Sequence, residues 1–127
     1  MRRGVRHALL LLALLAAAWP RAAAADEYVY TPEDTLSAMQ MHSDLAACIV
    51  RVEVGGGWYG GPPYDPNAIG QDGERGAVQL HPYGLLPLYE EWSGGASPYD
   101  PYTSMDFLDW AIEQGYGPQW SSWWWCA

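Results

Sequence analysis

The stretch that decides the fold of this chain is Ala47-Cys48-Ile49-Val50-Arg51-Val52-Glu53-Val54-Gly55-Gly56-Gly57. Apolar side chains recur here at helical spacing, which predicts a helix whose buried face is made of Leu45, Cys48, Ile49 and Val52. Glu53 follows Ile49 by four residues, so it lies beside that face. The glycines end the helix without steric cost. The stretch therefore predicts a short apolar helix with one carboxyl group in its last turn.

The chemistry expected of Glu53 follows from this position. The last turn of a helix carries unpaired carbonyl groups with partial negative charge, and the apolar face beside Glu53 removes water. Both effects disfavour the carboxylate, so we expect the pKa of Glu53 to be raised. A carboxylic acid that stays protonated near neutral pH can donate its proton to a leaving oxygen. Glu53 is thus a candidate general acid, the alternative being a solvated residue at a helix end.

Three more segments follow Glu53 and Gly55-Gly56 in a fixed order: Asp65-Pro66-Asn67-Ala68, Gly76-Ala77-Val78-Gln79 before Leu80-His81-Pro82, and Gln114-Gly115-Tyr116-Gly117-Pro118-Gln119-Trp120 before Cys126. This order resembles the lysozyme-like superfamily, in particular lytic transglycosylases and cell-wall hydrolases of the resuscitation-promoting-factor type. The resemblance spans Thr31 to Cys126. Two departures stand out. Val54 replaces the usual Ser, and the Ala-Tyr-Asn stretch of many lytic transglycosylases is absent.

The resemblance implies an α+β fold, mainly α, of the lysozyme-like type with a small β hairpin. It implies an exported, peptidoglycan-cleaving glycosidase or lytic transglycosylase that cuts the glycan strand between N-acetylmuramic acid and N-acetylglucosamine. Glu53 would be the general acid and Gln79 would hold a sugar N-acetyl group or a water molecule. Asn67, Tyr116 and Trp120 would bind substrate. Two alternatives stay open: a non-catalytic module that binds peptidoglycan or chitooligosaccharides, and a secreted inhibitor or adhesin.

Other candidate site residues follow from their chemistry. Trp58 and Tyr59 lie close to Glu53 in sequence, and their flat rings match the apolar faces of sugars. Asp72 or Glu74 is a candidate second carboxylate, which would stabilise the transition state or orient water. The alternative for both acids is that they only form the turn around Gly73.

The first 25 residues are typical of a signal peptide. Three arginines precede the apolar run Ala8–Ala18, and Ala23-Ala24-Ala25 offers a cleavage site. An uncleaved N-terminal anchor is the alternative. We expect residues 26–30 to be a short leader and residues 31–127 to be one domain. No later stretch is apolar for long enough to cross a bilayer, so we expect a secreted protein.

Removal of the signal peptide, residues 1–25, leaves two basic residues against 15 acidic ones, a formal charge of −13. This charge excludes nucleic acid as an expected partner, because binding to phosphates requires cationic surface. We also expect no cofactor and no metal. The calcium-like loop that begins at Asp65 has Ile69 at a ligand position and Gly76 where a glutamate is required. The expected partner is the peptidoglycan glycan strand, and the expected state is a monomer.

Cys48 and Cys126 are the only cysteines. In an exported protein they are expected to form a disulfide, which would attach the C-terminal tail to the helix that carries Glu53. Closing this loop would stabilise the fold by about 4 kcal/mol on the chain-entropy account. Two free buried thiols are the alternative.

Capping patterns predict where the N-terminal helices begin. Thr31, followed by Pro32 and two acids, is typical of a helix start. Ser43 or Asp44 can cap the helix that runs to Glu53. Whether these segments form one helix or two is open from sequence.

The later part of the chain predicts three further elements. A small hairpin is expected around the turn Asp72-Gly73. Residues 76–80 predict a short helix that Pro82 ends. Thr103 is expected to cap a helix that ends at Gly115, with a buried face made of Phe107, Leu108, Ala111 and Ile112.

Overall fold

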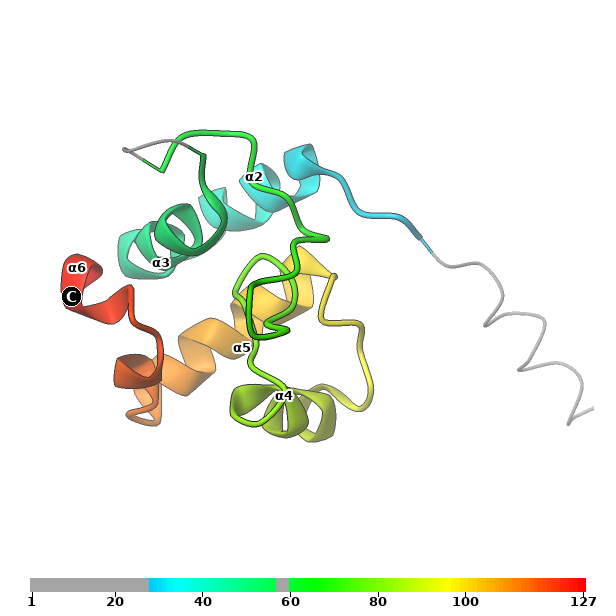
Figure 1. Ribbon diagram of the computed structural model, residues 1–127, viewed down its shortest axis with the longest axis vertical. Coiled ribbons are helices and arrows are strands. Elements are labelled where there is room, and N and C mark those ends of the chain that lie inside the picture. Colours follow the sequence, from blue (N-terminus) through cyan, green and yellow to red (C-terminus); the bar gives the residue numbers. More distant parts are fainter. Residues whose placement is uncertain (1–27, 57–59) are drawn as a thin grey trace, which may run out of the picture.

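Helix α5, Pro101–Glu113, is the element on which three of the other α-helices pack. It contacts α2 (Pro32–Gln40), α3 (Asp44–Val54) and α4 (Leu85–Ser93), as Figure 1 shows. The computed structural model describes residues 28–56 and 60–127, and over these it is mainly helical. The mainly α character expected from the sequence is confirmed, whereas the lysozyme-like arrangement stays a prediction.

The N-terminal caps are those that the sequence predicts. The Thr31 hydroxyl accepts the backbone N–H of Asp34, and the Asp34 carboxylate accepts the backbone N–H of Thr31 in return. The Ser43 hydroxyl accepts the N–H of Ala46 at 3.2 Å. The cap at Ser43 starts a new helix, so residues 32–54 form two helices, α2 and α3.

The cap of α5 differs from the prediction. Asp100, not Thr103, occupies the cap position, and its Oδ1 accepts the N–H groups of Tyr102 and Thr103 at 3.0 and 3.2 Å. The Thr103 hydroxyl instead donates to Asp100 Oδ2 at 2.7 Å. Pro101 fits the first helical position because it lacks the N–H that would otherwise need a partner. At the other end, Gly115 adopts a φ of 89° just beyond the helix, as expected.

The buried face of α3 is also shifted from the expected one. Its buried residues are Ala46, Ala47, Ile49 and Val50. Of the expected set only Ile49 is buried, since Leu45 and Cys48 are half-buried and Val52 is 48% exposed. The two small alanines permit close packing against neighbouring helices, so they turn inward although they are less apolar. On α5, by contrast, Phe107, Leu108 and Ala111 are buried as expected, and Ile112 is half-buried.

The loop of residues 60–82 runs between α3 and α4 (Figure 1). Its residues form only isolated bridges: Gly61 pairs with Gly56, Ile69 pairs with Arg75, and Arg75 pairs with Leu80. The described part of the chain contains no hairpin, because the pairing does not extend beyond these single contacts. The prediction of a short helix over residues 76–80 is wrong. Gly76 and Gln79 have φ values of 82° and 52°, in the left-handed region, which a right-handed helix cannot include.

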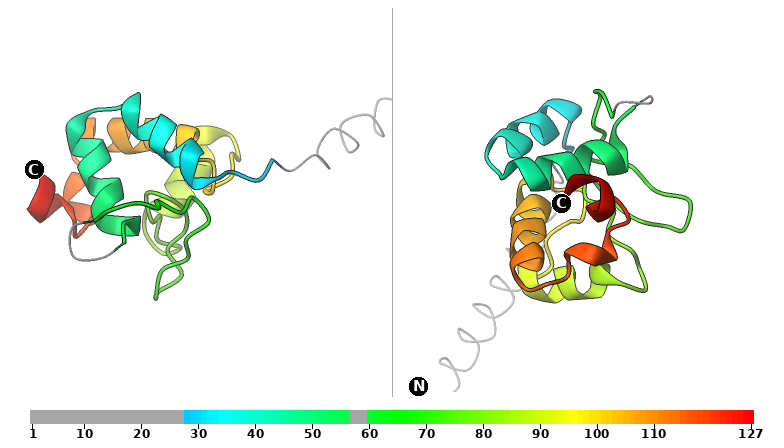
Figure 2. Two further views of the ribbon diagram at one scale, coloured as in Figure 1. Left: turned by 90° about the horizontal axis from the view of Figure 1, so that it is seen from above. Right: turned by 90° about the vertical axis from the view of Figure 1, so that its left-hand side faces the viewer.

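The C-terminal segment returns to α3. The turn η1, Gly117–Gln119, is followed by the short helix α6, Trp123–Cys126, which lies beside α3 (Figure 2). The expected disulfide is present between Cys48 and Cys126, whose Cα atoms are 5.8 Å apart. Within residues 28–56 and 60–127, the helices are too short or too polar for any of them to span a lipid bilayer.

Candidate functional site

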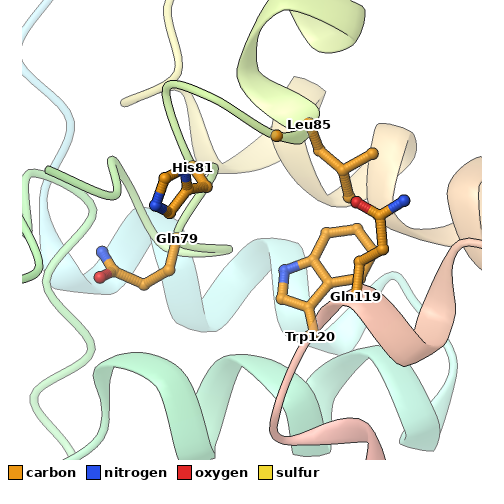
Figure 3. Close-up of a pocket in the computed structure, with 6 residues that line it drawn as sticks. Gln79, His81, Leu85, Gln119 and Trp120 are labelled. Carbon is orange, nitrogen blue, oxygen red and sulfur yellow. The ribbon is translucent and has the colours of Figure 1, made fainter. Parts of the chain in front are cut away.

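A pocket of about 280 Å³ opens where three segments meet. Its volume is near the lower end of the range for small-ligand sites. Its lining comes from the end of α3, the 70–81 loop and the C-terminal segment, namely Glu53; Gly70, Gln71, Glu74, Gln79 and His81; and Gln119, Trp120 and Ser121. A smaller hollow of about 50 Å³ shares Gln79, His81, Gln119 and Trp120 with it and reaches Leu85 (Figure 3).

Glu53 is the acidic group that α3 places in this pocket. Its side chain is half-buried, and its Oε1 accepts a hydrogen bond from the Ser122 hydroxyl at 2.8 Å. Burial raises the pKa of Glu53, and the negative charge of Glu74 adds a smaller effect, while the hydroxyl and the backbone of Ser122 both lower this pKa. The net shift is upward, the direction expected from the sequence. A glutamic acid in this state can donate a proton to a bound molecule.

Glu74 is the second carboxyl group of the pocket. Its Oε2 accepts the backbone N–H of Asp72 at 3.1 Å, and its own carbonyl oxygen accepts the N–H of Gly70 at 2.8 Å. These bonds fix the turn, and Glu74 is close enough to Glu53 for its negative charge to act on the pKa of Glu53. Of the two candidate acids it is therefore Glu74, and not the exposed Asp72, that lines the pocket.

Gln79 presents its amide in a fixed orientation. Its Nε2 donates to the carbonyl oxygens of Gly76 at 2.9 Å and Ala68 at 3.3 Å. Because both partners are acceptors, the assignment of the amide nitrogen is determined, and Oε1 points the other way, toward Gly70 in the pocket. The oxygen is an acceptor for an N–H group or a water molecule.

Trp120 forms a wall of the pocket. It is only 4% exposed, and its indole N–H donates to the carbonyl of Val78 at 2.7 Å, so that donor is already used. Figure 3 shows its ring across the smaller hollow from His81. Trp120 can therefore shape the pocket and contact a ligand at its edge, while holding the C-terminal segment to the 76–81 turn.

Several residues expected to bind substrate are not among those that line the pocket. The Asn67 amide donates to the carbonyl of Tyr30 at 3.1 Å and so ties the loop to the N-terminal segment. The ring of Tyr116 lies against Trp110, with centroids 6.3 Å apart. Trp58 and Tyr59 fall outside the described residues.

The structure brings His81 to the pocket, which the sequence did not suggest. One ring nitrogen of His81 and carboxylate oxygens of Asp72 and Glu74 lie within 4.8 Å of one another. However, His81 Nδ1 accepts the backbone N–H of Tyr83 at 3.0 Å, so the proton of the neutral ring is on Nε2. A metal-binding imidazole needs one free lone pair and an N–H on its other nitrogen. This cluster therefore offers an N–H donor beside two carboxylates and does not fit a metal.

Sequence reasoning also missed Ser122, which is 1% exposed and contacts Glu53 from a position 69 residues away. No local pattern predicts a contact of that range. For His81 the sequence did contain a signal, since two acidic residues, Asp72 and Glu74, precede a histidine. In the structure the bridge between Arg75 and Leu80 places Glu74 and His81, which flank it, side by side.

Comparison of the chain with protein-family models, with curated proteins and with solved structures gave no match.

Proposed function

We propose that this chain is an exported enzyme with a lysozyme-like fold that cleaves the glycan strand of peptidoglycan, with Glu53 as its general acid. The observation that carries the proposal is the environment of Glu53. Its carboxyl group opens on a pocket, and burial raises its pKa while a second acid, Glu74, stands nearby. The order of sequence motifs supplies the substrate class.

In the proposed reaction Glu53 gives its proton to the oxygen that bridges two sugars, and the bond from this oxygen to the anomeric carbon breaks. The leaving sugar departs as an alcohol, and an oxocarbenium-like centre remains. Water attacks this centre in a hydrolase; in a lytic transglycosylase the sugar's own 6-hydroxyl attacks and forms an anhydro product. In either case the proton of the attacking hydroxyl group returns to the Glu53 carboxylate.

The other pocket residues have supporting roles in this proposal. The Glu74 carboxylate stabilises positive charge at the anomeric carbon. Gln79 Oε1 accepts the N–H of a sugar N-acetyl group, since its own N–H donors are already bound to the loop. Trp120 and Gln119 limit the space in which the sugar can sit.

The test is the substitution Glu53→Gln, which keeps the shape and removes the proton. We expect it to abolish release of soluble muropeptides from purified sacculi, measured by mass spectrometry. The matched control is Glu113→Gln, which alters an exposed glutamate in the last turn of α5. This control should release fragments at the rate of the unchanged protein. Hydrated and anhydro ends of the products distinguish the two reactions.

Full activity of Glu53→Gln would refute the role of Glu53. If the unchanged protein binds sacculi and releases no fragments, the chain is a binding module and the enzymatic proposal is wrong. If it neither binds nor cleaves sacculi at low or high salt, peptidoglycan is not its partner.

A further inference from the structure

The hydroxyl group of Ser122 is held against one oxygen of Glu53. Ser122 precedes α6 and is 1% exposed, and its Oγ lies 2.8 Å from Glu53 Oε1. Three contacts fix the segment that carries it: Trp120 donates to Val78, Trp123 lies against Gly117, and Cys126 is bonded to Cys48. The position of the Ser122 hydroxyl relative to α3 is therefore set by the fold.

The direction of this hydrogen bond follows from the burial of Ser122. Within the part of the chain that the structure describes, Glu53 Oε1 is the only acceptor that the Ser122 hydroxyl has. If the acid proton were on Oε1 and pointed at Ser122, the hydroxyl hydrogen would be buried without an acceptor. An unsatisfied buried donor costs about 1–3 kcal/mol. The lower-energy arrangement has Ser122 donating and Oε1 accepting, whether Glu53 is charged or neutral.

We infer that Ser122 is a positioning residue that fixes Glu53 Oε2 as the oxygen that carries the acid proton and delivers it into the pocket. Oε1 takes the hydrogen bond from the buried Ser122 hydroxyl, and because Glu53 lines the pocket we assign Oε2 to the side that faces a bound molecule. The inference rests on the proposed function of Glu53 as general acid. Val54, which replaces the usual Ser after Glu53, has no hydroxyl group to donate to the acid. In this inference Ser122 supplies that hydroxyl from the C-terminal segment.

A second effect of Ser122 provides an independent readout. Its hydrogen bond stabilises the carboxylate and thereby lowers the pKa of Glu53 against the larger effect of burial. Removing the hydroxyl takes away the larger of the two Ser122 effects that oppose burial and leaves only that of the Ser122 backbone, so the pKa of Glu53 should rise further. A residue that only supported the fold would not change this titration.

The experiment compares Ser122→Ala with Ser104→Ala. Ser104 is a matched control because its hydroxyl is equally buried and donates to a backbone carbonyl within α5, away from the pocket. For each variant the Glu53 carboxyl is titrated by carbon NMR, and muropeptide release from sacculi is measured against pH. In Ser122→Ala we expect the Glu53 titration and the alkaline limb of kcat to move to higher pH. We also expect kcat to fall about tenfold with KM little changed. Ser104→Ala should leave both curves in place.

A Glu53 titration in Ser122→Ala that coincides with that of the unchanged protein would overturn the inference. If no variant releases fragments, the proposed function fails, and the NMR titration still decides whether Ser122 acts on Glu53. If Ser122→Ala does not fold, the inference is tested on the unchanged protein by NMR of the Ser122 hydroxyl proton. Its Ser122 hydroxyl proton should exchange slowly with water and correlate with the Glu53 side chain, and rapid exchange would contradict the inference.

Discussion

Two opposing effects act on the carboxyl group of Glu53. Burial disfavours the charged form and is the larger effect, and the Ser122 hydroxyl favours it. The sequence predicted the first effect because it depends on the local pattern of α3. The second effect depends on Ser122, 69 residues further along the chain, so the residues around Glu53 could not predict it. The proton affinity of this group is therefore a property of the fold and not of α3 alone.

Gly70 provides a test of the pocket at the same scale. A Cβ atom there would overlap Glu74 Oε2 and would lie 2.5 Å from Gln79 Oε1. In Gly70→Ala both side chains must move, and since the added methyl group meets the ends of side chains and not the backbone, we expect the fold to persist. Displacing the second carboxylate and the amide should lower kcat/KM for muropeptide release about tenfold or more.

The control for Gly70→Ala is Gly61→Ala, where the added methyl group meets, among the residues that the structure describes, nothing closer than the carbonyl oxygen of Gly56 at 3.9 Å. It should leave kcat/KM unchanged. Both variants are compared with the parent by circular dichroism and thermal unfolding. Wild-type activity in a folded Gly70→Ala would show that neither Glu74 nor Gln79 takes part in the reaction.

At the scale of elements, the caps show what local sequence determines. Thr31 and Ser43 begin α2 and α3 as predicted, since a cap depends only on the next three residues. Residues 76–80 formed no helix, because the backbone there is bent by left-handed conformations at Gly76 and Gln79. Two hydrogen bonds hold the Gln79 amide to this bent turn. The spacing of apolar residues in the sequence does not predict them.

The junction of α3 with α6 carries a second prediction. Cys48 lies five residues before Glu53, and Cys126 lies four residues after Ser122, so the disulfide links the two segments that meet at the acid. Replacing both cysteines by serine should lower the free energy of unfolding by about 2–4 kcal/mol, measured by urea denaturation. It should also shift the Glu53 titration toward that of Ser122→Ala, because α6 would be less firmly held. An unchanged unfolding midpoint would show that the disulfide is not needed to keep α6 on α3.

For the molecule as a whole, α5 provides the support on which the pocket depends. Phe107 is fully buried, and its ring lies 5.3–5.7 Å from those of Tyr89, Trp92 and Trp110. This cluster joins α4 to α5, and α3 packs on α5 as well, so α5 connects the elements that surround the pocket. The sequence predicted the helical class, the buried face of α5 and the disulfide. It did not predict which loop residues would meet Glu53, since that depends on how all the helices pack.

The most direct test of the account is a titration of the Glu53 carboxyl in the unchanged protein by carbon NMR, with Glu53→Gln used to assign the signal. Because burial outweighs the hydrogen bond from Ser122, we predict a midpoint above 4.5, the ordinary value for glutamic acid. Activity on sacculi should then decline as the pH rises through that same midpoint, since only the protonated form can donate. A midpoint at or below the ordinary value would contradict the account, because Glu53 would then be a solvated carboxylate without a proton to give.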